Sequence, residues 1–138
     1  MRKLGWATTA ALLCVLATVP VSLAASSPFE GSWTSIDPVD GSTQHLSVRG
    51  SAGHVQLKYI DEFGTTCVDV GAPTTVFSGV LAGTVAGTEM VATFKSAGCG
   101  PRLVIRAADR FAWIFEYDQN TNTLFGAIND GPATWYRE

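Results

Sequence analysis

The sequence predicts an all-β fold, a single antiparallel up-and-down barrel of about eight strands with one disulfide. Apolar and polar residues alternate after residue 28, and helical periodicity is nearly absent there. Turn signals recur about every 8–12 residues, the spacing expected of a barrel or a sandwich. Short links favour pairing between strands that follow one another in the chain. A two-sheet β-sandwich fits the same strand count and is the alternative.

Turn residues separate the first five expected strands. The segment 37–42 combines Pro38, which cannot donate to a strand ladder, with Asp40-Gly41, which tolerates the dihedral angles of a tight turn. Glycine-rich segments at 50–53 and 83–87 mark two further turns. The strands are expected at residues 31–35, 43–49, 54–60, 74–81 and 89–95. Alternation predicts that their inward side chains include Leu46, Val48, Val55, Leu57, Tyr59, Val76, Met90, Ala92 and Phe94, and Phe77 is a further candidate on the fourth strand.

The C-terminal half carries the clearest alternation in the chain. Four aromatic residues share one face of a strand that follows the turn at Asp109-Arg110: Phe111, Trp113, Phe115 and Tyr117. Polar turns at 118–122 and 129–132 separate the strands after it. The expected strands of this half are residues 102–107, 111–117, 123–128 and 133–137.

The N-terminal segment is typical of a secretory signal peptide. Basic Arg2 and Lys3 precede an apolar stretch at 10–19, and Ser22-Leu23-Ala24 supplies the small residues of a cleavage site. An uncleaved anchor is the alternative, but the apolar stretch is shorter than the ~20 residues that span a bilayer. We therefore expect a signal peptide at 1–24 and one domain at 25–138, secreted or placed on the exterior of the cell envelope.

The charge of the mature chain excludes some classes of partner. Loss of Arg2 and Lys3 leaves seven basic residues against twelve acidic ones, a net charge of −5. A mildly acidic surface disfavours nucleic acid and anionic membranes, so neither is an expected partner after cleavage. The remaining length suits a single core, and we expect a monomer.

The cysteines indicate a structural disulfide. Cys14 lies in the signal peptide, which leaves Cys67 and Cys99, and two cysteines in an exported chain are most simply paired. Both lie in loop-like segments, so the bond would join two connections. A metal site would require further ligands nearby, and His45 and His54 are the sole histidines. No metal or cofactor is expected.

Two resemblances support this interpretation. Gly31-Ser32-Trp33 and Arg137 resemble the Gly-x-Trp and terminal Arg of calycin barrels, which include lipocalins, avidins and secreted metalloprotease inhibitors. The resemblance implies that Arg137 packs over the Trp33 ring and closes one end of the barrel. The second motif of lipocalins is absent, and the ligand residues of avidins cannot be matched.

The second resemblance covers more of the chain. Several motifs are similar to those of uncharacterised secreted bacterial modules: Gly31-x-Trp33-Thr34-Ser35-x-Asp37, Asp40-Gly41-Ser42-Thr43-Gln44-x-Leu46, Tyr59-x-Asp61, residues 92–100 and Tyr117-Asp118. This similarity implies the domain limits and the paired cysteines. It implies no activity.

The residues supply no catalytic set, so a non-enzymatic protein is expected. His45 and His54 face away from the core, and no nucleophile elbow, zinc-protease or phosphate-loop motif occurs. Turn chemistry explains Asp37 and Asp40, and solvation at a strand exit explains Asp61 and Glu62. The calcium-loop similarity at 118–129 fails at its glycine and glutamate positions, so a polar hairpin turn is expected there.

The aromatic residues are candidates for a small apolar pocket inside the barrel, although a packed core is the alternative. The candidate pocket residues are Trp33, Tyr59, Phe94, Phe111, Trp113, Phe115 and Trp135. If Ile60, Ile114 and Phe125 are outward and adjacent, they form an apolar patch that suits a protein partner.

The leading functional hypothesis is therefore a secreted non-enzymatic binding module for a small apolar molecule or a protein surface. By fold analogy, a secreted protease inhibitor that presents Ala25-Ser26-Ser27-Pro28 as an arm is the alternative. A small hydrolase that uses surface carboxylates is the third hypothesis.

Overall fold

A computed structural model describes residues 26–100, 103–104, 112–128 and 131–138 of the chain. The predicted signal peptide, Phe111 and most of the strand expected at 102–107 lie outside these residues. The elements are β1 (Gly31–Ile36), β2 (Thr43–Ser51), β3 (His54–Asp61), α1 (Thr65–Asp69), β4 (Phe77–Ala86), β5 (Glu89–Cys99), β6 (Leu103–Val104), β7 (Ala112–Asp118), β8 (Thr123–Ile128) and β9 (Gly131–Arg137).

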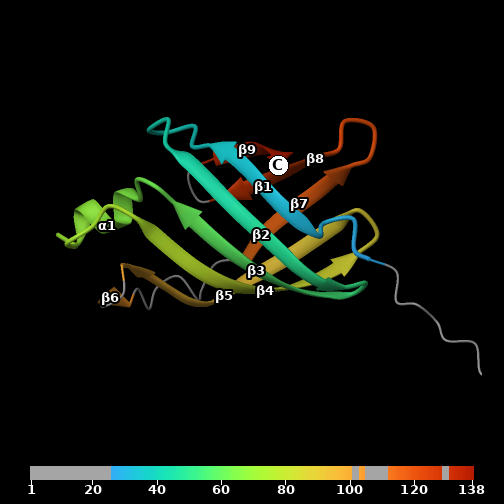
Figure 1. Cartoon of the computed structure of the whole chain (residues 1–138), viewed down its shortest axis with the longest axis horizontal. Helices are drawn as coiled ribbons and strands as arrows, with labels where there is room; N and C mark the ends of the chain where they lie inside the picture. Colours follow the sequence, from blue (N-terminus) through green and yellow to red (C-terminus); the bar gives the residue numbers. More distant parts are fainter. Residues whose placement is uncertain (1–25, 101–102, 105–111, 129–130) are drawn as a thin grey trace, which may run out of the picture.

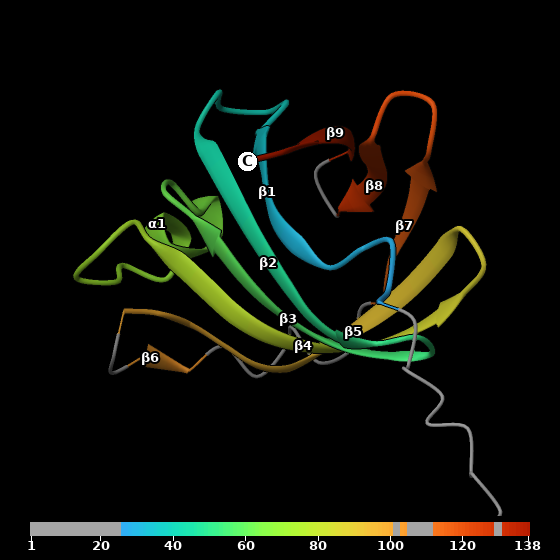
Figure 2. The same ribbon diagram turned by 45° about the vertical axis from the view of Figure 1, so that its right-hand side comes forward.

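Eight strands of the described chain form a closed up-and-down barrel (Figures 1 and 2). Neighbours in sequence pair antiparallel from β1 to β5, β5 pairs with β7, and β7, β8 and β9 follow in order. β9 returns to β1 through the pairs Trp33–Arg137 and Thr34–Tyr136. β6 pairs with the C-terminal end of β5 through Gly98–Val104 and Cys99–Leu103. The ring of pairings confirms the predicted barrel and rules out the sandwich.

The fourth strand differs from its expected range. β4 covers Phe77–Ala86 instead of 74–81, with a register shift between Val80 and Leu81 in its pairing with β5. Gly83, expected in a turn, lies inside the strand. The position suits glycine because a Cβ atom there would lie 2.9 Å from Val55 Cγ2. The turn comes later, at Gly87. Val76, expected inward, precedes the strand and is exposed, and Phe77 packs against the core instead.

The disulfide is confirmed, but neither cysteine lies in a loop. Cys67 belongs to the five-residue helix α1, and Cys99 is the last residue of β5, which runs beyond its expected end at residue 95. Their Cα atoms are 5.5 Å apart, and both side chains are fully buried. The bond thus fastens α1 to the barrel wall.

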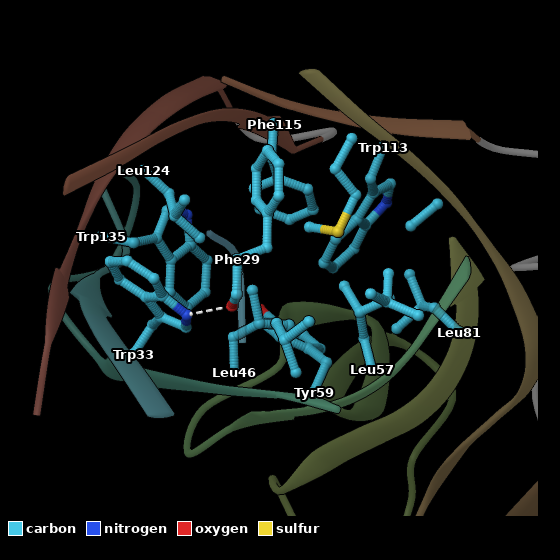
Figure 3. Packing of buried hydrophobic residues seen from close by; sticks show 14 of the residues in the cluster. Phe29, Trp33, Leu46, Leu57, Tyr59, Leu81, Trp113, Phe115, Leu124 and Trp135 are labelled. Carbon is cyan, nitrogen blue, oxygen red and sulfur yellow. Dashed lines mark hydrogen bonds between the residues drawn. The ribbon is translucent and has the colours of Figure 1, made fainter. Parts of the chain in front are cut away.

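The inward side chains meet in one apolar core, in which Phe115 and Trp135 are prominent (Figure 3). Two inward glycines leave space for rings. A Cβ atom at Gly79 would lie 2.3 Å from Phe94 Cε1, and one at Gly126 would lie 2.5 Å from Phe115 Cδ1. The rings of Phe94 and Phe115 therefore fit because a nearby position on the adjacent strand has no side chain.

One end of the barrel is sealed by the segment that precedes β1. Phe29 is fully buried, and its carbonyl accepts a 2.9 Å hydrogen bond from Trp33 Nε1 (Figure 3). The Arg137 guanidinium lies 4.1 Å from the Trp33 ring centroid and donates to the carbonyls of Pro28 and Glu30. The predicted Trp33–Arg137 contact is thus present. We call this end, formed by Phe29, Trp33 and Arg137, the sealed end.

The opposite end holds the β1–β2 link and the β3–β4 link with α1, on the left of Figure 1. We call it the α1 end. The two links are neighbours, because Glu62 N donates to Thr43 O at 3.1 Å. Within the described residues, no helix combines the length and apolar character needed to cross a bilayer.

Candidate binding site

Four buried polar residues lie inside the α1 end, and we call them the polar layer: Ser35, Asp37, Gln44 and Asp61. Ser35, Gln44 and Asp61 are register partners across β1, β2 and β3, and Asp37 follows the end of β1. Alternation places Gln44 and Asp61 inward, because each lies two residues from an inward apolar side chain. The polar layer thus continues the inner face of the barrel beyond its apolar core.

Hydrogen bonds join the carboxylates of the polar layer to their surroundings. Gln44 Nε2 donates to Asp37 Oδ2 at 2.7 Å, and Val39 N donates to Asp37 Oδ1 at 2.6 Å. Asp61 Oδ1 accepts from Ser42 Oγ at 2.9 Å and from Phe63 N at 3.1 Å. The bond from Val39 N is a turn interaction, as expected from the sequence, whereas the bond from Gln44 is not.

Asp61 is not the solvated side chain that the sequence predicts at the end of a strand. Its side chain is buried, because β3 keeps its alternation to the last residue and turns this carboxylate inward. Burial raises the pKa of Asp61, and the nearby Asp37 and Asp40 carboxylates add to the rise, while the Phe63 amide and Ser42 hydroxyl oppose it. The ion pairs of the described residues join His45 to Glu62 and Glu138, and none involves Asp37 or Asp61.

The raised pKa makes Asp61 a source of pH-dependent stability. A carboxyl whose folded pKa is raised contributes stability that is present below its unfolded pKa and lost as the pH rises through its folded pKa. Asparagine does not ionise, so Asp61→Asn removes this loss. The free energy of unfolding of the variant minus that of wild type should therefore increase as the pH is raised from about 3 to about 7. Urea unfolding at both pH values measures the change.

Asp118→Asn is the matched control for that experiment. Asp118 is exposed, and hydrogen bonds from Asn120 and Thr121 lower its pKa. A lowered pKa stabilises the fold above the unfolded pKa, so this variant should change relative to wild type in the opposite direction. The same pH trend in both variants would contradict the assignment for Asp61.

Three buried polar atoms lack a hydrogen-bond partner in the described structure: Gln44 Oε1, Trp113 Nε1 and Trp135 Nε1. An unpaired buried donor or acceptor costs about 1–3 kcal/mol. Two indole donors and one amide acceptor thus remain available inside the barrel for a bound molecule.

Five of the predicted pocket residues form a connected aromatic cluster: Tyr59, Phe94, Trp113, Phe115 and Trp135. The Trp113 ring lies 4.8 Å from both Tyr59 and Phe94, and Phe115 lies 6.2 Å from both Trp113 and Trp135. All five side chains are at most 5% exposed, so the rings pack against one another. Trp33 lies beside Trp135 in Figure 3, and its ring centroid is 6.3 Å from that of Tyr117. Phe111 is outside the described residues.

Several exposed apolar side chains lie at the α1 end, at the end of β1 and on the two links. We call this set the apolar rim: Ile36, Val39, Phe63, Val68, Val70 and Val76, which are 38–61% exposed. The three other large apolar residues with high exposure, Ile114, Phe125 and Tyr136, lie on the outer wall over β7, β8 and β9. The condition for an apolar patch of Ile60, Ile114 and Phe125 is met only in part. Ile114 and Phe125 are diagonal neighbours, but Ile60 is on β3, is only partly exposed and does not adjoin them.

The remaining candidates from the sequence lie elsewhere. His45 and His54 face outward, and Asp118 opens a polar hairpin turn by accepting from Asn120 N at 2.8 Å. No group of three or more His, Cys, Asp or Glu that could hold a metal ion occurs among the described residues.

Comparison of the chain with protein-family models, curated proteins and solved structures finds no match. The residues and their geometry are therefore the basis for inferring a function.

Proposed function

We propose that the protein is a secreted binding module that docks a protein partner on the apolar rim. The observation that carries the proposal is that six exposed apolar side chains lie at one end of the barrel, at the end of β1 and on the β1–β2 and β3–β4 links. Apolar surface of this kind, rimmed by polar residues, is typical of protein interaction sites. Asp40 and Asp69 supply polar surroundings on the same links.

The rim is held in place by the fold, which favours binding. The Cys67–Cys99 disulfide fastens α1, which carries Val68, to β5. Gly64 N donates to Thr75 O at 2.8 Å and joins the two ends of the β3–β4 link. A preorganised surface loses less conformational entropy when a partner binds. The disulfide also supports export, because such bonds persist in oxidising compartments.

Two alternative functions have less support. Residues of the arm that an inhibitor would present are fastened to the barrel: Ser27 is buried, and the Pro28 carbonyl accepts from Arg137 Nη2 at 2.8 Å. A hydrolase would use the carboxylates of Asp37, Asp40, Asp61 and Glu62. Asp40 and Glu62 are exposed, but Asp37 and Asp61 are buried, which leaves each pair with one carboxylate that reaches solvent. We therefore propose neither.

Polar substitutions on the rim test the proposal. The double variant Phe63→Ser/Val70→Ser should weaken partner binding by about tenfold or more, because apolar anchors supply most of the energy of an interface. Both side chains are exposed, so the fold should keep its stability. Quantitative affinity capture from medium conditioned by the source cells, followed by titration of the captured protein, measures the effect.

The matched control is Ile114→Ser/Phe125→Ser, which removes comparably exposed apolar side chains from β7 and β8 on the outer wall. Tyr136 is left in place because it lines a surface hollow together with Ile36 of the rim. The control variant should retain the partner at wild-type affinity. Equal affinity of the rim variant and this control for the captured protein would overturn the proposal.

A further inference from the structure

We propose that the polar layer binds a small primary alkylammonium ion between Asp61 and Gln44. This site lies inside the barrel and is independent of the apolar rim.

Two acceptor groups face one another at this position. Gln44 and Asp61 are direct register partners on β2 and β3, and both side chains point inward. Residues placed in this way have Cβ atoms about 5 Å apart. Gln44 Oε1 has no partner in the described structure, and both hydrogen bonds described for Asp61 reach its Oδ1 atom. The missing component between the two residues is a donor.

The amide orientation of Gln44 is fixed by its neighbour. Gln44 Nε2 donates to Asp37 Oδ2 at 2.7 Å, and rotation of the amide would place two oxygens against each other. Gln44 Oε1 is therefore directed away from Asp37. Gln44 is 1% exposed, and its buried amide oxygen lacks a donor, which indicates a group that the protein itself does not supply.

A cation would pair with an ionised carboxylate in this layer. Asp37 and Asp61 are at most 6% exposed, and no described ion pair involves either one. Buried carboxylates are normally paired with a positive group. A calcium ion would need about 6–8 oxygen ligands, more than this layer offers. A primary ammonium has three donors and can satisfy Asp61 Oδ2 and Gln44 Oε1 together.

Aromatic rings next to the layer suit the apolar part of such an ion. Tyr59 lies two residues from Asp61 on the same inner face of β3, and its ring is 4.8 Å from that of Trp113. Aromatic faces attract ammonium groups and accommodate alkyl chains. The low exposure of these side chains limits the ligand to a short chain.

Titration with n-butylammonium tests the proposal, and n-butanol is the neutral probe of matched shape. Wild-type protein at neutral pH should show saturable shifts of its indole N–H signals with the ammonium. Binding should be at least about tenfold weaker for the alcohol, which has no charge to pair with Asp61. This comparison uses wild-type protein and does not depend on the folding of a variant.

Asp61→Asn should weaken n-butylammonium binding by about tenfold or more, while Asp118→Asn, which removes an exposed carboxylate, should leave it unchanged. Equal binding of the two probes, equal binding by the two variants, or no saturation with n-butylammonium would overturn the proposal. The last result is also expected if Asp61 carries its own proton and donates to Gln44. None of these outcomes affects the rim, whose variants are assayed separately.

Discussion

Replacing Cys67 and Cys99 together by alanine is expected to lower the free energy of unfolding by about 3–4 kcal/mol. The two residues are 32 positions apart, and in the loop-entropy model a closure of this size strongly restricts the unfolded chain. Both side chains are fully buried, so alanine avoids leaving a polar hydroxyl in the core. Urea unfolding of the variant and of the oxidised wild type measures the difference.

The loss should also appear locally, in α1. This helix has five residues and no side-chain N-cap, so it is too short to persist by itself. Amide exchange should accelerate at Val68 and Val70 more than in β2 or β8. Reduced wild-type protein is the control and should behave like the variant. A change below about 1 kcal/mol would show that the barrel contacts alone hold α1.

The barrel could be predicted because its strands follow simple alternation. The inward Leu46 and Val48 on β2, and the aromatic run on β7, are arranged as their spacing predicts. The Trp33–Arg137 contact followed from a resemblance, since no local pattern relates two residues at opposite ends of the chain. These features depend on the two-residue period of a strand, which the sequence displays directly.

The errors have local physical causes. The helix α1 has no periodicity or cap to reveal it and depends on a bond formed with distant Cys99. Gly83 resembles a turn residue, yet it is needed inside β4 for close packing. The polar layer was detectable, because extending the inward positions of β2 and β3 by one step reaches Gln44 and Asp61. Because both residues are polar, their side chains resemble those of solvent-exposed positions, although they point into the barrel.

The two ends of the barrel differ in how their polar groups are satisfied. At the sealed end, the Trp33 indole and the Arg137 guanidinium have carbonyl partners supplied by residues 28–30. Toward the α1 end, Gln44 retains an unpaired atom beneath an exposed apolar rim. Both proposed binding surfaces lie toward the α1 end, so substitutions at the sealed end should change stability and leave the proposed binding unchanged.

Trp33→Ala is expected to lower the free energy of unfolding by about 3–5 kcal/mol. The variant loses a fully buried ring, its hydrogen bond to the Phe29 carbonyl and its contact with Arg137. The segment before β1 should then detach, because Phe29 loses its neighbour. Chemical unfolding measures the loss, and limited proteolysis between residues 26 and 30 should become faster than in wild type.

Conservative substitutions separate ring packing from hydrogen bonding. Trp33→Phe retains an aromatic ring but leaves the buried Phe29 carbonyl without its indole donor. Trp135→Phe removes an N–H group that has no partner in the described structure. Both side chains are fully buried, so the packing losses are comparable, and Trp33→Phe should be the more destabilising by about 1 kcal/mol. Equal losses would mean that the Trp33–Phe29 hydrogen bond contributes nothing to closing the barrel, and that ring packing alone seals this end.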